Sequence, residues 1–428
     1  MKRNVAWALA GNVVYAGCQW AMLVALAKLC SPETVGQFAL GVAVTSPVVL
    51  LTGLQLRAAL ATDVTGTFSL EEYLGLRLIA TAAGLATIAA VVVAAGYREE
   101  TQWAVLAVGL GKAVESVSDL IYGVLQRNER MDLIARSMIL RGAGTLLALG
   151  VTVQATGSVF WGALALAAVS LVLLVAYDMP AAARVIPASG RRGVPLGWQA
   201  AAAALRPTWR IAGLWRLARE TLPLGFVMML IGLNRNLPRY FVERSMGERE
   251  LGIFAAIAYI QVAGSTVVDA VCQSASPRLA GHHAAGRVRQ FRGALAKLAG
   301  LASLMGAVGV GAALLAGRQV LALLYGAEYA AESPVLIWLM AVAAVGYVGS
   351  VLGYGITATR RFALFPVPYL ALTAVAAFCS AYAIPRWGLY GACATAGLVS
   401  LGSCVVPFLV LFQVREESKH VASPSFAA

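Results

Sequence analysis

The chain has 428 residues, of which 60% are hydrophobic and only 12% charged, and its mean hydropathy is +0.77. Soluble domains are about 45–50% apolar, so this composition excludes an ordinary soluble protein. The net charge of +13 would suit nucleic-acid binding, but most of the 33 basic residues fall in alternate loops between apolar runs. That distribution is typical of membrane proteins, and no nucleic-acid partner is expected.

Apolar runs recur along the whole chain, and each is long enough to cross a hydrocarbon core of about 30 Å. The sequence predicts an all-α polytopic membrane protein with about twelve spans. An even number of spans places both termini on one side, and the basic loops on that side predict that it is the cytoplasm. The predicted spans are residues 5–28, 36–57, 74–97, 102–125, 133–154, 157–177, 221–243, 251–275, 294–316, 333–357, 362–384 and 388–413.

The two halves of the chain resemble each other. ETVGQFALG (33–41) opens the second span and RELGIFAAI (249–257) opens the eighth, and both contain an aliphatic-Gly-x-Phe-Ala pattern. Equivalent helices run in the same direction, which indicates a parallel repeat, and transporters place their binding sites between such repeats. We predict two pseudo-symmetric six-helix lobes with a basic linker between them. The boundaries are 1–178 and 221–414 for the lobes, 179–220 for the linker and 415–428 for a cytoplasmic tail.

The linker contains seven arginines interleaved with Trp198, Trp209 and Trp215. Basic and tryptophan residues together are typical of segments that lie in the headgroup layer. A tether between the two lobes is the interpretation that we favour over a regulatory element.

Four predicted spans carry polar residues at the spacing of a helix face. The sets are Asn12, Tyr15 and Gln19; Lys112, Glu115 and Asp119; Arg235, Arg239 and Glu243; and Gln261, Ser265, Asp269 and Gln273. A polar face on an apolar helix indicates a bundle interior or an aqueous cavity.

Some of these charges have a structural interpretation. Lys112 and Glu115 are three residues apart and can neutralise each other. Asp119 and Arg141 lie at similar depths on adjacent spans, which predicts an ion pair between the two helices.

The arginines divide by position. Arg57 and Arg77 lie near the cytoplasmic ends of their spans, where long side chains reach the headgroups. Arg239 can reach the outer interface or pair with Glu243. Arg235 has no acidic neighbour on its face, which favours an anionic substrate such as a phosphate. Pro238 is expected to break the ladder of helical hydrogen bonds between these last two arginines.

Enzymatic signatures are absent from the sequence. There is no Walker-type loop, and the three histidines stand apart from any cysteine or carboxylate cluster. The six cysteines have no metal-site spacing. We expect no catalytic residue, no cofactor and no metal.

The chain resembles the oligosaccharide flippases of the multidrug/oligosaccharidyl-lipid/polysaccharide (MOP) exporter superfamily. The stretches that carry this resemblance are PETVGQFALGVAVTSPVVLLTGLQLRAALATD (32–63), NLPRYFVERSMGERELGIFAAIAYI (236–260), QSASPRLA (273–280), LYGAEYA (324–330) and IPRWGLYGA (384–392).

The resemblance implies two six-helix lobes in a V, the MATE-like fold, and alternating access. It implies a polyprenyl-pyrophosphate-linked oligosaccharide as cargo, carried across the bacterial cytoplasmic (inner) membrane for surface polysaccharide synthesis. The lipid bilayer, polysaccharide polymerase and export machinery are the other expected partners. Candidate substrate-binding residues are Asn12, Gln19, Arg57, Arg77, Arg141, Asn234, Arg235, Asn236, Arg239 and Gln261. Candidate coupling residues are Lys112, Glu115, Asp119 and Asp269.

Two other functions stay open. A cation-coupled multidrug or metabolite exporter on the same fold predicts a cavity dominated by carboxylates and aromatic residues. A membrane-embedded polysaccharide polymerase or ligase is disfavoured because the predicted outer loops are short.

Overall fold

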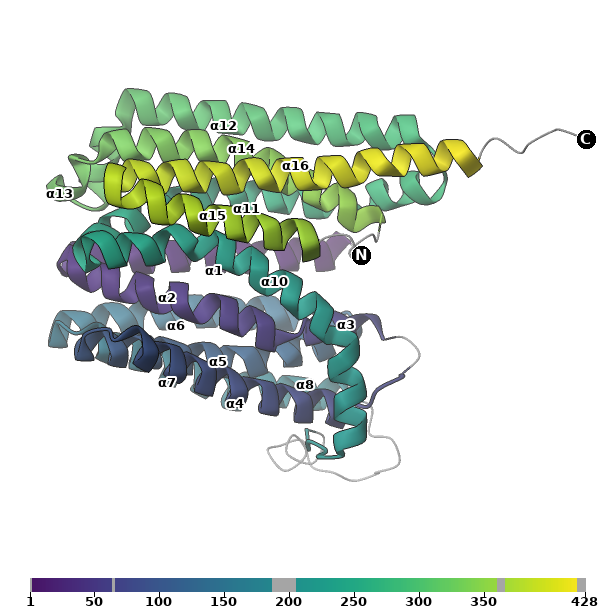
Figure 1. Ribbon diagram of the computed structural model, residues 1–428. Coiled ribbons are helices and arrows are strands. Elements are labelled where there is room, and N and C mark those ends of the chain that lie inside the picture. Colours follow the sequence, from purple (N-terminus) through teal and green to yellow (C-terminus); the bar gives the residue numbers. More distant parts are fainter. Residues whose placement is uncertain (1, 64–65, 187–204, 360–365, 422–428) are drawn as a thin grey trace, which may run out of the picture. The chain divides into compact units, whose positions relative to one another are not determined.

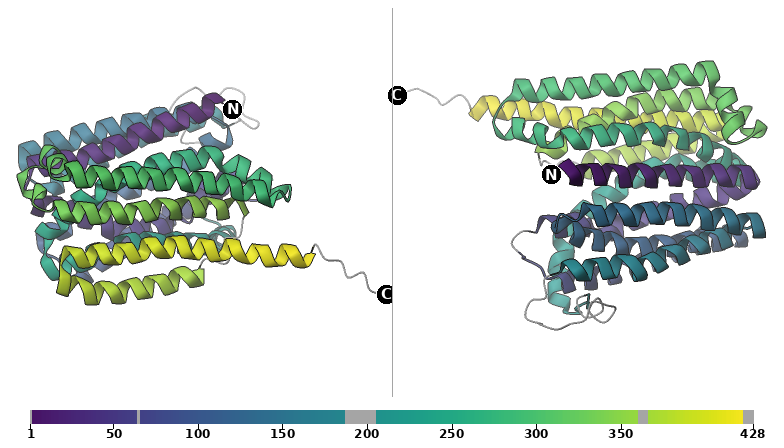
Figure 2. Two further views of the ribbon diagram at one scale, coloured as in Figure 1. Left: turned by 90° about the horizontal axis from the view of Figure 1, so that it is seen from above. Right: turned by 180° about the vertical axis from the view of Figure 1, so that it is seen from behind.

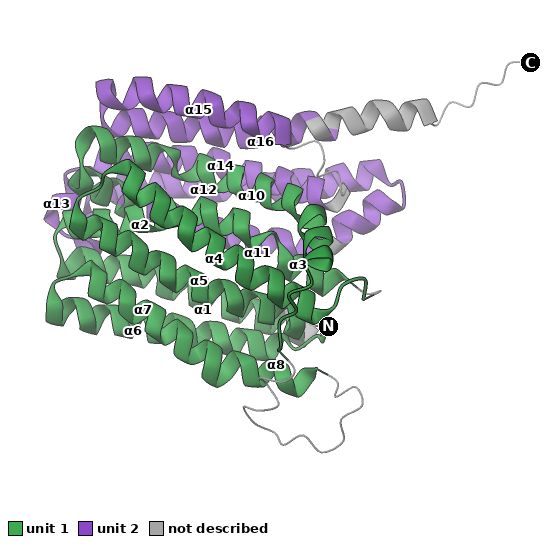
Figure 3. Cartoon of the chain, turned by 60° about the horizontal axis from the view of Figure 1, so that its bottom comes forward, with its two compact units in different colours: residues 1–256 green, residues 257–428 purple. Residues whose placement is uncertain are grey.

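A computed structural model describes residues 2–63, 66–186, 205–359 and 366–421 of the chain. These residues form helices joined by short turns, with no strand among them. They divide into two compact units, Met1–Ala256 and Ile257–Ala428, which Figure 3 shows in different colours. The middle of the predicted linker, 187–204, and the end of the predicted tail, 422–428, lie outside the described residues.

The helices follow one another along the chain as Figure 1 labels them. The first unit contains α1 (Lys2–Leu29), α2 (Pro32–Gly53), α3 (Leu56–Thr62), α4 (Leu70–Ala95), α5 (Glu99–Arg127), α6 (Met131–Thr156), α7 (Val159–Leu173), the π-helix η1 (Leu174–Asp178), α8 (Met179–Val185), α10 (Ile211–Met246) and the start of α11 (Glu248–Ala284). The second unit contains the rest of α11, then α12 (Val288–Leu324), α13 (Ala327–Ala330), α14 (Ser333–Thr359), α15 (Pro366–Trp387) and α16 (Leu389–Val421).

Ten stretches in the described helices are long and apolar enough to cross a membrane. This confirms the predicted all-helical, multi-pass architecture. Ten of the predicted spans each match one long helix, apart from residues 362–365, which lie outside the described residues. The span predicted at 36–57 covers α2 and the start of α3, and the one predicted at 157–177 covers α7 and η1. The helices α5 and α10 are not among the ten, because charged side chains lower their hydropathy. These two helices carry half of the candidate site residues.

Small residues let the helices of the first unit approach one another. The helix α1 packs along α6, with Gly11 against Ala135, and Figure 2 shows these two helices side by side. The helix α2 packs on α5, with Gly41 against Val108. Lipid tails are as apolar as leucine, so close packing of this kind is what holds membrane helices together.

Two irregularities within the helices set the positions of charged side chains. The helix α2 ends at Gly53, and Leu54 and Gln55 adopt left-handed conformations with φ of 49° and 50°. Such φ values are uncommon outside glycine, and here they start α3 in a new direction just before Arg57. The π-helix η1 ends at Asp178.

The helix α10 is continuous from Ile211 to Met246 and contains both Pro223 and Pro238. Proline has no backbone N–H, so Pro238 removes one hydrogen bond from the ladder, but the helix continues through it. The helix packs mainly on α2, where Gly225 lies against Leu54. It also changes direction along its length (Figure 1).

In the second unit α14 packs between α12 and α16 (Figure 2). Gly306 of α12 lies against Ala344 of α14, so small residues hold this unit together as they do the first. The Tyr347 hydroxyl donates to the backbone oxygen of Gln261 at 2.9 Å and fixes α14 against α11.

Candidate functional site

Three helices of the first unit bring two arginines to one carboxylate. Arg57 of α3 places Nη1 3.2 Å from Oδ1 of Asp119 on α5, and Arg77 of α4 places Nη2 3.8 Å from Oδ2 of the same residue. Arg57 Nε also donates to Gln126 Oε1 at 3.2 Å, and Arg77 Nη1 donates to Ser116 Oγ at 3.2 Å. We call these five residues the Asp119 cluster.

The Asp119 cluster carries one positive charge more than its carboxylate neutralises. Its carboxylate is open, because the Asp119 side chain is 44% exposed, whereas the Arg77 side chain is only 2% exposed. Arg77 Nε is buried and makes no hydrogen bond with any residue that the structure describes. Burying a charge that is not fully paired costs free energy, so this guanidinium has unused capacity for an anion.

The prediction that Arg57 and Arg77 reach the headgroups was wrong for Arg77. Its side chain turns into the unit because Asp119 and Ser116 lie on the neighbouring helix. Arg57 is about one-third exposed and still contacts two residues of α5. The break after α2 turns it toward them, and hydropathy carries no signal for such a break.

A second cluster lies deeper in the same unit. Arg141 Nη2 on α6 donates to Asp178 Oδ2 at 2.8 Å and to Ser118 Oγ at 2.7 Å. Ser137 Oγ donates to Asp178 Oδ1 at 2.5 Å, and the Tyr122 hydroxyl lies 2.7 Å from Ser137 Oγ. We call these five residues the Asp178 cluster. Its charges balance, and Arg141 and Asp178 are both buried.

The predicted pair between Arg141 and Asp119 was therefore wrong in its acidic partner. Asp178 stands at the boundary between the predicted first lobe and the linker, and the sequence analysis gave it no role. A buried arginine needs a carboxylate at the same depth, and that requirement was the available signal for Asp178.

The aromatic ring of Tyr122, in the Asp178 cluster, lies near an arginine of each cluster. The guanidinium carbon of Arg57 is 5.6 Å from the ring centroid, and that of Arg141 is 5.9 Å from it. Both distances are within the range of a cation–π attraction. The ring thus joins a cluster with surplus charge to one whose charge is balanced.

Lys112 and Glu115 form the ion pair that their spacing predicts. Lys112 Nζ lies 2.7 Å from Glu115 Oε2, and both side chains are partly exposed. Coupling or substrate roles for the two residues stay predictions.

The helix α10 holds the other predicted arginines. Arg235 is exposed, and it makes no hydrogen bond or ion pair with any residue in the described part of the chain. Its neighbours Asn234 and Asn236 are buried. Arg239 Nη1 donates to Asn236 Oδ1 at 2.9 Å. The Tyr240 hydroxyl donates to the backbone oxygen of Ala43, which fixes this part of α10 against α2.

The remaining predicted residues lie on α1 and α11. Asn12 is exposed on α1 and donates its side-chain amide to Ala8 of its own helix at 2.8 Å. Gln19 is half-buried two turns further along α1. Gln261 and Asp269 belong to the second unit, where Asp269 Oδ1 accepts from Ser350 Oγ at 2.6 Å. The structure does not bring Asn12 or Gln19 into the clusters of the first unit.

The two repeated motifs meet in the structure. A Cβ added to Gly36 would overlap the backbone carbonyl of Glu248, and a Cβ added to Gly252 would overlap the backbone carbonyl of Pro32. We call this reciprocal packing the glycine contact. It brings the start of α11 against the start of α2 and explains why both motifs carry glycine at the same place.

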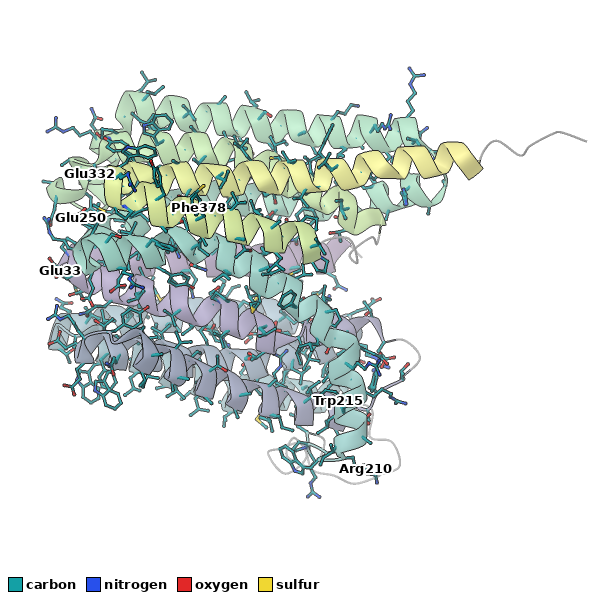
Figure 4. All side chains as sticks on the ribbon, in the orientation of Figure 1. Glu33, Arg210, Trp215, Glu250, Glu332 and Phe378 are labelled. Atoms are coloured by element: carbon teal, nitrogen blue, oxygen red, sulfur yellow. The ribbon has the colours of Figure 1, made fainter. Side chains whose placement is uncertain are left out.

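A carboxylate reinforces the glycine contact. The Glu248 side chain is 10% exposed and accepts from Gln37 Nε2 at 3.1 Å and from the Thr101 hydroxyl. Arg249 lies 3.7 Å from Glu33. Figure 4 shows Glu33 and Glu250 together at one end of the first unit, opposite the end that carries Arg210 and Trp215. The sequence analysis gave Glu248 no role, although its position at the head of a repeated motif was a usable signal.

The fold identifies the class of protein. The structure matches an inward-facing multidrug resistance MATE transporter of the MOP superfamily with a TM-score of 0.62, covering 99% of this chain and 96% of that one at 15% identity. It matches a MOP superfamily transporter from Pyrococcus furiosus, described as having a binding pocket of reversed polarity, with the same TM-score and identity over 99% and 97% of the two chains. The chain is a multi-pass membrane protein with the fold of MATE transporters, as the sequence resemblance implied.

A relative with a biosynthetic role is also similar in sequence. The capsular polysaccharide biosynthesis protein CapF of Staphylococcus aureus is 26% identical over 396 residues, which are 92% of this chain and 95% of that protein. No family model matches the chain.

Proposed function

We propose that the chain is a flippase that moves polyprenyl-pyrophosphate-linked oligosaccharide from the inner to the outer leaflet of a bacterial cytoplasmic membrane. It works by alternating access, with both termini in the cytoplasm, and supplies a surface polysaccharide pathway whose polymerase acts on the far side. The transporter fold of the structural neighbours supports translocation, and the capsular polysaccharide relative supports the class of cargo.

The lack of a partner for the Arg235 guanidinium among the described residues is the observation on which the assignment of the cargo rests. A cation within a membrane helix costs several kcal/mol unless a partner or water compensates it. Arg235 has no such partner among the described residues, and a pyrophosphate would supply two phosphate groups for its guanidinium. Arg239 and Asn236, already bonded to each other one turn away, would bind the same anion or the first sugar.

The Asp119 cluster is the second proposed contact. Its surplus positive charge and the unused Nε of Arg77 suit the same anion, or acidic sugars, at another stage of the transport cycle. Arg141 is fully engaged with Asp178 and Ser118, so we give it a supporting role instead of direct contact.

Export of surface polysaccharide in a strain that lacks the gene tests this function. The intact chain is expected to restore export, and Arg235→Ala to reduce it by about 10- to 100-fold, as for the loss of one hydrogen bond to a charged group. Lipid-linked oligosaccharide should then accumulate on the inner leaflet.

Arg244→Ala is the matched control, because Arg244 is an exposed arginine at the end of the same helix. Equal export with Arg235→Ala and Arg244→Ala would remove Arg235 from the site. Unchanged export on deletion of the gene would remove the flippase function itself.

A cation-coupled exporter is the alternative, and one further observation favours it. Asp269 accepts a hydrogen bond from Ser350 and forms no ion pair within the described residues. A carboxylate without a fixed cationic partner is suited to binding a coupling cation. This function predicts that deletion increases sensitivity to cationic drugs with no loss of polysaccharide. It also predicts that Asp269→Asn abolishes drug export.

A further inference from the structure

The first turns of α10 lie across the ends of the helices of the first unit. Figure 1 shows this part of α10 passing the ends of α4 and α8 at a steep angle to them, whereas its later part runs with α2. Pro223 lies within the helix, and a proline there removes one backbone hydrogen bond and favours a bend. A segment that crosses the ends of membrane helices lies close to the plane of the membrane surface.

This segment is fixed to the unit by one of its sides. Leu205, Leu214 and Leu217 are buried in a hydrophobic cluster with Tyr73 and other residues of α4. Two further contacts add to this: Thr208 N donates to the Glu71 carbonyl at 2.9 Å, and the Glu72 side chain packs against Gly213. The segment is therefore a packed part of the first unit.

The opposite side of the segment is both aromatic and basic. Three large apolar side chains on this side are exposed: Trp209 by 58%, Ile211 by 82% and Trp215 by 68%. Exposed apolar side chains that gather in one patch typically mark a surface that contacts a membrane or another protein. Four arginines are exposed among them: Arg206, Arg210, Arg216 and Arg219. Figure 4 shows Arg210 and Trp215 at this end of the unit.

These arginines differ in what they contact. The Arg216 guanidinium lies 4.9 Å from the centroid of the Phe68 ring, so it is held by the unit. Arg210 and Arg219 are exposed and make no hydrogen bond or ion pair with the residues that the structure describes. They are free to meet an external anion.

We propose that residues 206–219 form a binding surface for anionic phospholipid headgroups on the leaflet that faces the basic loops. The tryptophans and Ile211 insert at the boundary between headgroups and acyl chains, and the arginines bind the lipid phosphates. A segment with this composition and this placement is complementary to such a leaflet in charge and in depth. The inference does not depend on the cargo proposed above.

Lipid selectivity of the full chain tests this surface. The protein is purified and placed in nanodiscs of phosphatidylcholine with a minor fraction of phosphatidylglycerol, and the retained lipids are counted by native mass spectrometry. We expect the intact chain to retain phosphatidylglycerol about tenfold above its fraction. Each arginine near an anionic surface contributes about fivefold, so Arg210→Gln with Arg219→Gln is expected to remove most of that preference.

The control keeps the change in charge and moves it to other sites. Arg244→Gln with Arg318→Gln removes two exposed arginines outside the proposed surface and should leave the lipid preference within twofold. Trp215→Ala should weaken retention of both lipids and leave their ratio unchanged. An unchanged preference in the first double variant, or an equal loss in the control, would overturn the proposal.

Discussion

Asp119 and Asp178 are both bound by arginine in the same unit, but their surroundings differ. Asp178 is fully buried, faces one arginine, and accepts a further hydrogen bond from Ser137. Asp119 is 44% exposed, lies between two arginines, and leaves Arg77 Nε without a partner among the described residues. An arginine–aspartate pair is therefore structural where charges and hydrogen bonds balance, and a candidate binding site where a positive charge is left over.

Removing the arginine from the balanced cluster should have the largest effect. Arg141→Ala leaves Asp178 as an uncompensated buried charge and should destabilise the protein by about 3–5 kcal/mol. Thermal unfolding of the purified protein, and the amount of folded protein in membranes, measure this. Arg141→Met combined with Asp178→Leu should recover most of the loss, because apolar replacement of a whole buried pair is often neutral. An unchanged midpoint for Arg141→Ala would show that Asp178 is not charged in the folded state.

Substitutions in the Asp119 cluster should change the rate of transport. Arg77→Gln removes the surplus charge and is expected to slow translocation in proteoliposomes by about 10- to 100-fold, equivalent to about 1.5–3 kcal/mol for a hydrogen bond to a charged group. Asp119→Asn increases the surplus and should preserve translocation. Equal losses in the two variants would indicate a structural ion pair like that of Asp178. Matched unfolding midpoints are needed to separate the two explanations.

The glycine contact extends the comparison to a region held by backbone packing. Gly36→Ala places a methyl group against the Glu248 carbonyl, and overpacking of this kind costs about 1–3 kcal/mol. Gly17→Ala on α1 is the matched control, because an added Cβ there meets nothing within 4 Å. That control should be neutral or gain up to about 1 kcal/mol from helix propensity. Equal unfolding midpoints for both variants would contradict the contact.

The pair Lys112 and Glu115 should show the smallest effect. Their side chains are 33% and 23% exposed, and partly exposed pairs contribute about 0–1 kcal/mol. Lys112→Ala, Glu115→Ala and the double variant should therefore unfold within about 1 kcal/mol of the intact chain. A larger loss in translocation than in stability, for either single variant, would move this pair from the structural class to the functional one.

The helices could be predicted from the sequence because hydrophobic length determines them directly. Charged residues obscured this signal only in α5 and α10, whose helical spacing still marked them as spans. The pair between Lys112 and Glu115 was also predictable, because residues three apart on a helix are neighbours whatever the tertiary structure.

Partners on different helices could not be predicted in the same way. Arg57 reaches Asp119 because Leu54 and Gln55 adopt left-handed conformations, which no residue pattern at this point requires. Asp178 reaches Arg141 from the end of a π-helix, where the α-helical spacing used to assign faces no longer applies. Depth along a span could be read from the sequence, but rotation about the helix axis could not. The pair between Arg141 and Asp119 was wrong for that reason.

The glycine contact joins equivalent positions of the two repeated motifs. Gly36 meets the residue four positions before Gly252, and Gly252 meets the residue four positions before Gly36. Contacts in which residue i meets j and j meets i are isologous, the kind that two-fold homodimers make. Within this region one chain packs against itself as two identical subunits would.

Glu33 and Arg249 also occupy equivalent positions of the two motifs, and they lie 3.7 Å apart. In a homodimer a residue beside the two-fold axis faces its own copy, so glutamate would face glutamate. The two copies of a duplicated segment within one chain need not keep identical residues, because each copy can mutate alone. Two identical chains cannot place glutamate opposite arginine at equivalent positions, whereas this single chain does.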